Sequence, residues 1–317
     1  MTMNLLLWME NPGLYREALK NAGLADKLVI EELAPDAQPS PAQLANTELM
    51  LNWIAPPGIL AKMPRLKWIQ TPNTGVAAWL QRPDFREGIQ LSCGRGLHRV
   101  QMPENILGAL FHITKPYMQS AQSQAERQWR RRQSIPLAGA TLGILGLGAV
   151  GQELAKKAAA LEMRVIGTRY SARPVPHVEK VLGAQGTDEI LAQSDYVVVL
   201  LSDTHETQNL LDARRIGMMK NSAWLINFAR GNIIVDADLV AAVKTKTIGG
   251  AVLDVFRTEP LPTEHPFWTT EGIVVLSHLG GGHPDRERQV AAIFVENLRR
   301  YLNEEPQPGL VDRIKGY

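Results

Sequence analysis

The sequence predicts an α/β protein built from two doubly wound parallel-sheet domains. Short apolar runs alternate with helix-like patterns along most of the chain, which is typical of parallel sheets covered by helices. A chain of 317 residues is too long for one ordinary core and suits two domains. From residue 141 onward the apolar runs become longer and more continuous, which indicates that a second sheet begins there.

The N-terminal third supplies the first predicted sheet. Its expected strands cover residues 4–9, 28–32, 49–54, 68–70 and 89–93. Helices or helical turns are expected at residues 15–22, 41–45 and 58–63. Residues 103–113 carry apolar side chains at helical spacing, and Pro103 suits a first helical turn, so we expect a helix that leads into the second domain.

The second predicted sheet has six strands separated by helices. They are expected at residues 141–145, 163–167, 196–201, 223–227, 250–253 and 273–276. This count is typical of a doubly wound dinucleotide-binding fold. A last helix, about residues 285–303, ends near Pro306, and the tail is expected to return to the first domain. We therefore predict domains at 1–98 with 287–317, and at 99–286.

Composition argues against several classes of protein. There are 34 basic and 32 acidic residues, so the chain has no strong basic excess for binding nucleic acid or an anionic membrane. A basic cluster at 127–132 is interpreted as a solvated helix end or a subunit contact, and the polar stretch around Trp129 as a dimer contact or a flap. No apolar run approaches the ~20 residues that span a bilayer. With Cys93 as the single cysteine, no disulfide is required, and we expect a cytoplasmic protein.

A glycine-rich turn follows the first strand of the second domain. It has the G-x-G-x-x-G pattern and opens a helix, which is the context that pyrophosphate binding requires. Gly146 permits a tight turn, Gly148 lets the backbone approach the ligand, and Gly151 allows close packing. Free N–H groups of the first helical turn, at Ala149 and Val150, would bind the pyrophosphate. The alternative is a glycine turn with no ligand.

The end of the next strand predicts which nicotinamide is bound. NAD sites usually place an acidic residue about twenty positions after the glycines, where it binds the ribose. Here the sequence has no acid, and Thr168, Arg169, Ser171 and Arg173 are suited to pair with a 2′-phosphate. We predict that NADP(H) is preferred and that NAD(H) is possible; the alternative is that these arginines are simply solvated.

Three later segments each place polar residues directly after an apolar strand, where open α/β sheets bind ligands. The segment 225–231 carries Arg230, the segment 250–261 carries Asp254 and Glu259, and the segment 274–281 carries His278. Reduction of a 2-keto acid needs a cation for the carboxylate and carbonyl, which Arg230 supplies. It also needs a proton donor, and His278 can be that donor if Glu259 orients its ring. Taken singly, Arg230 could instead cap a strand end or form a surface ion pair. His278 could be a core histidine with satisfied hydrogen bonds, and Glu259 an ordinary loop acid.

These segments resemble the signature of the D-isomer-specific 2-hydroxyacid dehydrogenases, in particular the glyoxylate/hydroxypyruvate reductase-like branch. The similarity runs over nearly the whole chain, to the closing residues 311–317. It implies a flavodoxin-like substrate domain and a Rossmann cofactor domain with a cleft between them. It also implies reduction of a small 2-keto acid of the glyoxylate or hydroxypyruvate type to the D-2-hydroxy acid, in a homodimer, and the arginines after the second strand add the prediction of NADPH as the reductant.

The resemblance assigns further roles. Arg230, Glu259 and His278 match the catalytic residues, and backbone amides of Thr74, Gly75 and Val76 match the substrate-carboxylate loop. Ala229 and Asp254 match cofactor contacts, although Asp254 could equally cap its strand. No metal ion is expected. Ser277 departs from the family, which usually has proline before the histidine.

Two alternatives remain open. One is a dinucleotide-sensing binding protein of the kind found among corepressors that share this fold, and the other is a 3-phosphoglycerate dehydrogenase. We find no added partner-binding segment and no further regulatory domain in the sequence, and the arginine pair favours NADPH.

Overall fold

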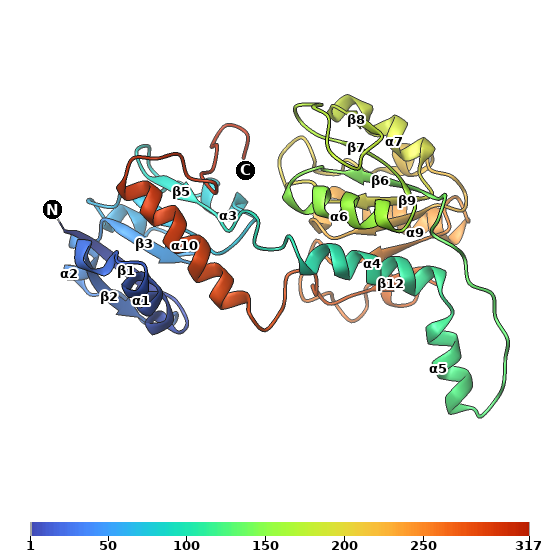
Figure 1. The fold of residues 1–317 in the computed structure, drawn as a ribbon, viewed down its shortest axis with the longest axis horizontal. Coiled ribbons are helices and arrows are strands. Elements are labelled where there is room, and N and C mark those ends of the chain that lie inside the picture. The colour runs from blue at the N-terminus through green and yellow to red at the C-terminus, as the bar shows by residue number, and fades with distance from the viewer. Residues whose placement is uncertain (1, 317) are drawn as a thin grey trace. The chain divides into compact units, whose positions relative to one another are not determined.

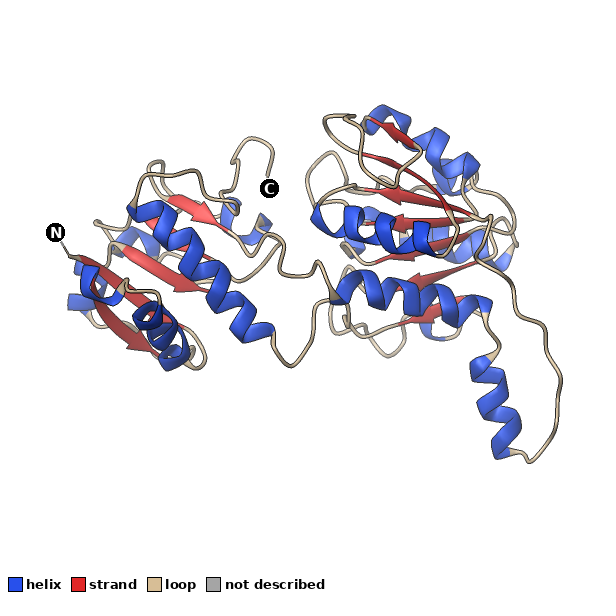
Figure 2. Ribbon diagram, viewed as in Figure 1, coloured by secondary structure: helices blue, strands red, loops and turns tan. Residues whose placement is uncertain are grey.

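The computed structural model describes residues 2–316 and divides into two compact units, drawn in Figure 1. The first unit consists of Met1–Leu97 and His283–Tyr317, and the second of His98–Gly282. Each unit contains one parallel β-sheet with helices on its faces (Figure 2). The predicted fold class is confirmed.

The first unit has a five-stranded sheet in the order β2-β1-β3-β4-β5. The strands are β1 (Met3–Trp8), β2 (Leu28–Leu33), β3 (Leu49–Asn52), β4 (Trp68–Gln70) and β5 (Gln90–Ser92). The helices are α1 (Pro12–Asn21), α2 (Pro41–Asn46), α3 (Ala77–Leu80) and α10 (Arg286–Leu302). The helix or helical turn expected at 58–63 is a single 3-10 turn, Leu60–Lys62. The strand order reverses direction between β1 and β3, the kind of switch point at which open α/β sheets bind ligands.

The C-terminal segment belongs to the first unit. Phe294 of α10 packs against Tyr15 and Trp68, with ring centroids 6.2 Å and 6.1 Å away. After α10, Leu310 forms an antiparallel bridge with Ser92 of β5. These contacts complete the core on one face and one edge of the first sheet.

The second unit has a seven-stranded sheet in the order β12-β11-β10-β9-β6-β7-β8. The strands are β6 (Thr141–Leu145), β7 (Arg164–Thr168), β8 (Lys180–Leu182), β9 (Tyr196–Val199), β10 (Trp224–Asn227), β11 (Gly250–Leu253) and β12 (Ile273–Val275). The helices of its body are α4 (Gln101–Thr114), α6 (Ala149–Ala160), α7 (Thr187–Gln193), α8 (Ala213–Ile216) and α9 (Asp236–Lys244). The expected count of six strands was wrong, because the short edge strand β8 pairs with β7.

Helix α5 (Tyr117–Ala125) and the loop after it stand away from the body of the second unit (Figure 1). This arm exposes four large apolar side chains, Tyr117, Met118, Trp129 and Ile135, and Trp129 is 98% exposed. Within residues 2–316, no helix combines the length and apolar character needed to cross a membrane.

Candidate active site

The glycine turn joins β6 to α6, and its three glycines have different environments. A Cβ on Gly146, whose φ is 108°, would lie 2.6 Å from the Leu200 carbonyl oxygen. A Cβ on Gly151 would lie 2.4 Å from the Gly146 carbonyl oxygen. A Cβ on Gly148 would meet no atom within 4 Å. Packing therefore explains the first and last glycines, whereas Gly148 borders open space that a ligand can approach.

The start of α6 has the donors that a diphosphate requires. Gly148 is the N-cap, and no side chain caps the helix. The first N–H groups, at Ala149 and Val150, have no partner within the helix and lie at its positive end. Open space beside Gly148 and these uncapped donors together fit the pyrophosphate of a dinucleotide.

The segment after β7 lies beside the glycine turn. The Thr168 carbonyl oxygen accepts hydrogen bonds from the N–H groups of Gly146 and Leu147, at 3.3 Å and 2.8 Å. The Thr168 residue is buried, Arg169 is half-buried, and Ser171 and Arg173 are exposed. Within the described chain, the two guanidinium groups form no hydrogen bond, ion pair or ring contact. Two uncompensated cations therefore follow the strand next to the phosphate turn.

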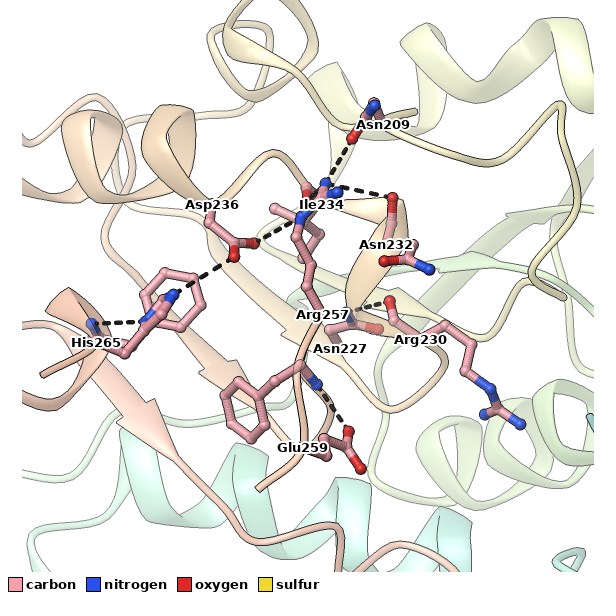
Figure 3. Close-up of polar contacts among 11 residues, drawn as sticks. Asn209, Asn227, Arg230, Asn232, Ile234, Asp236, Arg257, Glu259 and His265 are labelled. Carbon is pink, nitrogen blue, oxygen red and sulfur yellow. Dashed lines mark hydrogen bonds and ion pairs between the residues drawn. The ribbon is translucent and has the colours of Figure 1, made fainter. Parts of the chain in front are cut away.

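The turn that carries Arg230 is braced by Asn227 at the end of β10. The buried Asn227 side chain donates to the Arg230 carbonyl oxygen at 2.9 Å and accepts from the Ala229 N–H at 3.0 Å. In Figure 3 the Arg230 side chain extends away from this contact, and its Nη1 donates to the Ala229 carbonyl at 2.6 Å. A Cβ on the next residue, Gly231, would lie 2.0 Å from the Phe256 carbonyl carbon. The loops after β10 and β11 are therefore in direct backbone contact.

A second set of contacts fixes the loop that carries Glu259. The Arg257 guanidinium binds Asp236 at 3.3 Å, the Asn209 side chain at 2.5 Å, and the Ile234 carbonyl (Figure 3). Asp236 in turn lies 3.5 Å from Nε2 of His265. Because Arg257 is two residues before Glu259, this network holds the Glu259 loop against the loops on either side.

Glu259 and His278 form a close pair. His278 Nδ1 lies 2.6 Å from Oε2 of Glu259, and the other Glu259 oxygen accepts the Phe256 N–H at 2.9 Å. The His278 side chain is 52% exposed, and its Nε2 has no partner within residues 2–316. The carboxylate therefore orients the ring through Nδ1 and leaves Nε2 available to a substrate.

Asp254 supports the loop on which His278 lies. The carboxylate accepts the N–H groups of Leu279 at 2.6 Å and Gly280 at 2.9 Å, and the Asp254 carbonyl accepts the His278 N–H at 3.0 Å. Burial raises the pKa of Asp254 although these amide donors oppose the shift. In the structure Asp254 binds the loop after β12 and positions His278; its contact with a nicotinamide stays a prediction.

The predicted substrate loop lies in the first unit, after β4. The Trp53 carbonyl oxygen gathers three donors: Thr71 Oγ1 at 3.0 Å, Asn73 Nδ2 at 3.3 Å and Trp79 Nε1 at 3.1 Å. These bonds bracket Thr74, Gly75 and Val76 on both sides. The loop is therefore held at the carboxyl edge of the first sheet, whereas the other predicted site residues belong to the second unit.

Three residues that position the site, Asn227, Asp236 and Arg257, are not recognisable as such from the sequence. Asn227 lies in the segment 225–231 and Arg257 in the segment 250–261, but only the fold shows which residues they contact. Asp236 lies outside these segments, at the start of α9. The sequence gives no spacing signal for Arg257, because its partners are 21 and 48 positions away.

Comparison with known proteins adds independent findings. A family model described as "D-isomer specific 2-hydroxyacid dehydrogenase, NAD binding domain" matches residues 107–280. Glyoxylate/hydroxypyruvate reductase A from Photorhabdus laumondii is 31% identical over 283 residues, which cover 86% of this chain and 88% of that protein.

Solved structures are similar over the whole chain. A D-isomer specific 2-hydroxyacid dehydrogenase from Xanthobacter autotrophicus, in complex with NADPH and MES, is 27% identical with a TM-score of 0.88 and full coverage of both chains, 100% each. An NADPH-dependent glyoxylate/hydroxypyruvate reductase from Sinorhizobium meliloti, in complex with NADP and sulfate, is 25% identical with a TM-score of 0.84 and again 100% coverage of both chains.

Proposed function

The chain belongs to the D-isomer specific 2-hydroxyacid dehydrogenase family of NAD(P)-dependent oxidoreductases, and we propose that it reduces a small 2-keto acid to the D-2-hydroxy acid with NADPH. The observation that carries this proposal is the 2.6 Å contact between His278 Nδ1 and Glu259 Oε2. It leaves one ring nitrogen for a substrate, in the unit that also carries Arg230 and the glycine turn.

The residues divide the work as follows. Arg230 pairs with the substrate carboxylate and polarises the keto oxygen, since a guanidinium presents two parallel donors. His278 delivers the proton to that oxygen from Nε2, and Glu259 stabilises the imidazolium that precedes the transfer. The backbone N–H groups of Thr74, Gly75 and Val76 are proposed as further donors to the carboxylate. A bound nicotinamide would supply the hydride.

The preference for NADPH rests on charge. Arg169 and Arg173 have no anionic partner in the described chain, and no acidic residue occupies the end of β7. A 2′-phosphate would neutralise both cations, with Thr168 and Ser171 as additional donors. Two structural relatives were solved with NADPH or NADP, which supports the same assignment.

Glyoxylate and hydroxypyruvate are the proposed substrates, as in the name of the Photorhabdus relative. A homodimer is proposed as the assembly. The arm of α5 and its loop supports it, because isolated monomers rarely keep side chains such as Trp129 fully in water.

The test is an absorbance assay of NADPH and NADH oxidation with glyoxylate, hydroxypyruvate and larger 2-keto acids. Removal of two charge-assisted contacts in an Arg169→Ser, Arg173→Ser variant should raise the KM for NADPH by about 10- to 100-fold and leave the KM for NADH nearly unchanged. Lys156→Ser, which removes an exposed cation from α6, is the matched control. Faster turnover with NADH in the unaltered protein would contradict the NADPH assignment, and no turnover with any 2-keto acid would favour the dinucleotide-sensing alternative.

A further inference from the structure

Arg286, the first residue of α10, lies at the carboxyl edge of the first sheet and forms no ion pair among the described residues. Its guanidinium carbon lies 4.5 Å from the centroid of the Trp53 ring. Within residues 2–316 the guanidinium forms no hydrogen bond and no ion pair. It is half-buried, and burial lowers the pKa of Arg286. An unpaired, partly desolvated guanidinium is costly to the fold, so it requires an explanation beyond stability.

No neighbour of Arg286 forms an ion pair with it within residues 2–316, although the charge of Glu287 opposes the effect of burial on the Arg286 pKa. The adjacent Glu287 carboxylate is bound through both oxygens to the Asn11 side-chain amide, at 3.2 Å and 3.0 Å. The Tyr15 hydroxyl, which also faces Arg286, stays protonated because burial raises the pKa of Tyr15 to about 12. The N–H donors of the guanidinium are therefore available to a group that the described residues do not supply.

The position of Arg286 relates it to the proposed substrate loop. Trp53 follows β3, whose neighbour β1 marks the reversal of strand order in this sheet. The Trp53 ring lies under the guanidinium, while the Trp53 carbonyl holds Thr71 and Asn73, next to Thr74. A single residue thus connects Arg286 to the loop that receives the substrate carboxylate.

We propose that Arg286 is a specificity residue that binds a second carboxylate of the substrate, so that the enzyme favours 2-keto dicarboxylic acids over 2-keto monocarboxylic acids of equal length. This inference rests on the proposed function. The contact with the Trp53 ring, 4.5 Å from the guanidinium carbon, restricts the motion of the Arg286 side chain, which preorganises its donors for a carboxylate. Glyoxylate has no second acidic group, so its reduction does not use this contact.

The experiment compares oxaloacetate and 2-oxoglutarate with the 2-keto monocarboxylic acids of equal chain length, and with glyoxylate, in the full-length protein with NADPH. Arg286→Gln should raise the KM for the dicarboxylates at least about tenfold and change the glyoxylate constants less than about twofold. Arg286→Lys keeps the positive charge but not the planar pair of N–H donors. Its KM for the dicarboxylates should lie between those of the unaltered protein and Arg286→Gln. Arg288→Gln is the matched control, because Arg288 lies two residues further along the same helix, about half a turn away, and is exposed.

Each result decides the proposal. An equal loss on every substrate, including glyoxylate, would show that Arg286 only supports Trp53, and unchanged constants would show that it binds nothing. If the unaltered protein reduces no 2-keto acid, the proposed function fails separately. Titration calorimetry of 2-oxoglutarate then decides the inference: binding that Arg286→Gln abolishes upholds the anion site, and absent binding overturns it.

Discussion

The His278 ring is held in place by contacts at both its backbone and its side chain. Its φ of 55° lies in the left-handed region, which a non-glycine residue adopts only when its surroundings require it. The His278 N–H binds the Asp254 carbonyl and the ring binds Glu259. These contacts explain how histidine can follow Ser277 rather than proline: the loop does not depend on a rigid ring before the histidine.

Substitution of His278 by alanine should lower kcat by about 10²- to 10⁴-fold, the usual contribution of a general acid. The dissociation constant of NADPH, measured by fluorescence titration, should change little because His278 does not belong to the glycine turn. Glu259→Gln serves as the comparison; it keeps the side-chain size and should reduce kcat less than loss of the imidazole. A His278→Ala protein that kept most of its activity would assign the proton donor elsewhere.

The loops that follow the strands carry the site residues. The sequence predicts these residues but not the contacts that join one loop to another. Arg230, Glu259 and His278 were expected at strand ends because a polar residue follows a continuous apolar run in each case. The contacts between these loops cannot be predicted from the sequence. The fit of Gly231 against Phe256 and the network of Arg257 join residues that meet only after the sheet has formed.

Elements with a weak sequence pattern were missed for the same physical reason. Strand β8 has only three residues, and none of them is fully buried, so it lacks the apolar run that marks a buried strand. Helix α5 has few apolar residues and packs little against the body of its unit, so a helical core face is absent. Both elements are recognised from their neighbours in space, which the order of residues does not reveal.

A buried ion pair in the first unit gives a stability prediction. Arg82 donates to both oxygens of Asp84 at 2.9 Å and 2.8 Å, and Asp84 also accepts the Leu60 N–H at 3.1 Å. Asp84→Asn should lower the free energy of unfolding at pH 7 by about 3 kcal/mol, because it leaves a buried guanidinium without its counter-charge. Urea unfolding at several pH values measures this difference.

The pH dependence follows from the same pair. Hydrogen bonds from Arg82 lower the pKa of Asp84 in the folded chain, so the unfolded chain binds the proton more readily. The contribution of the pair is therefore complete above about pH 4 and is lost as the pH falls through the folded-state pKa. The difference in the free energy of unfolding between the unaltered protein and Asp84→Asn should therefore decrease only below about pH 4. Asp36→Asn, at an exposed position, should show no such gap; a constant gap at all pH values would contradict the ionic explanation.

For the molecule as a whole, the periodicity of apolar residues predicted two parallel sheets because each sheet is covered by helices and buries continuous strands. The return of the tail is explained by specific contacts. The Trp68 indole donates to Gln307 at 2.9 Å, and a Cβ on Gly309 would lie 2.4 Å from the Cys93 carbonyl oxygen. A sequence shows that a helix ends near Pro306, but which strand edge the following residues join depends on close approaches of this kind.

The arm of the second unit leads to the last prediction. Trp129 is 98% exposed and shares the arm with three further exposed apolar side chains, so a second copy of the chain is the proposed occupant of this surface. Because a buried tryptophan often dominates an interface, Trp129→Ser should raise the dimer dissociation constant at least about tenfold in sedimentation equilibrium. Ile314→Ser is the control, since Ile314 is equally exposed, at 98%, but lies in the first unit. If the unaltered protein is a monomer, or if Trp129→Ser dimerises as tightly as Ile314→Ser, the arm is not part of a dimer interface. The exposed Trp129 side chain would then be assigned to contact with a different partner.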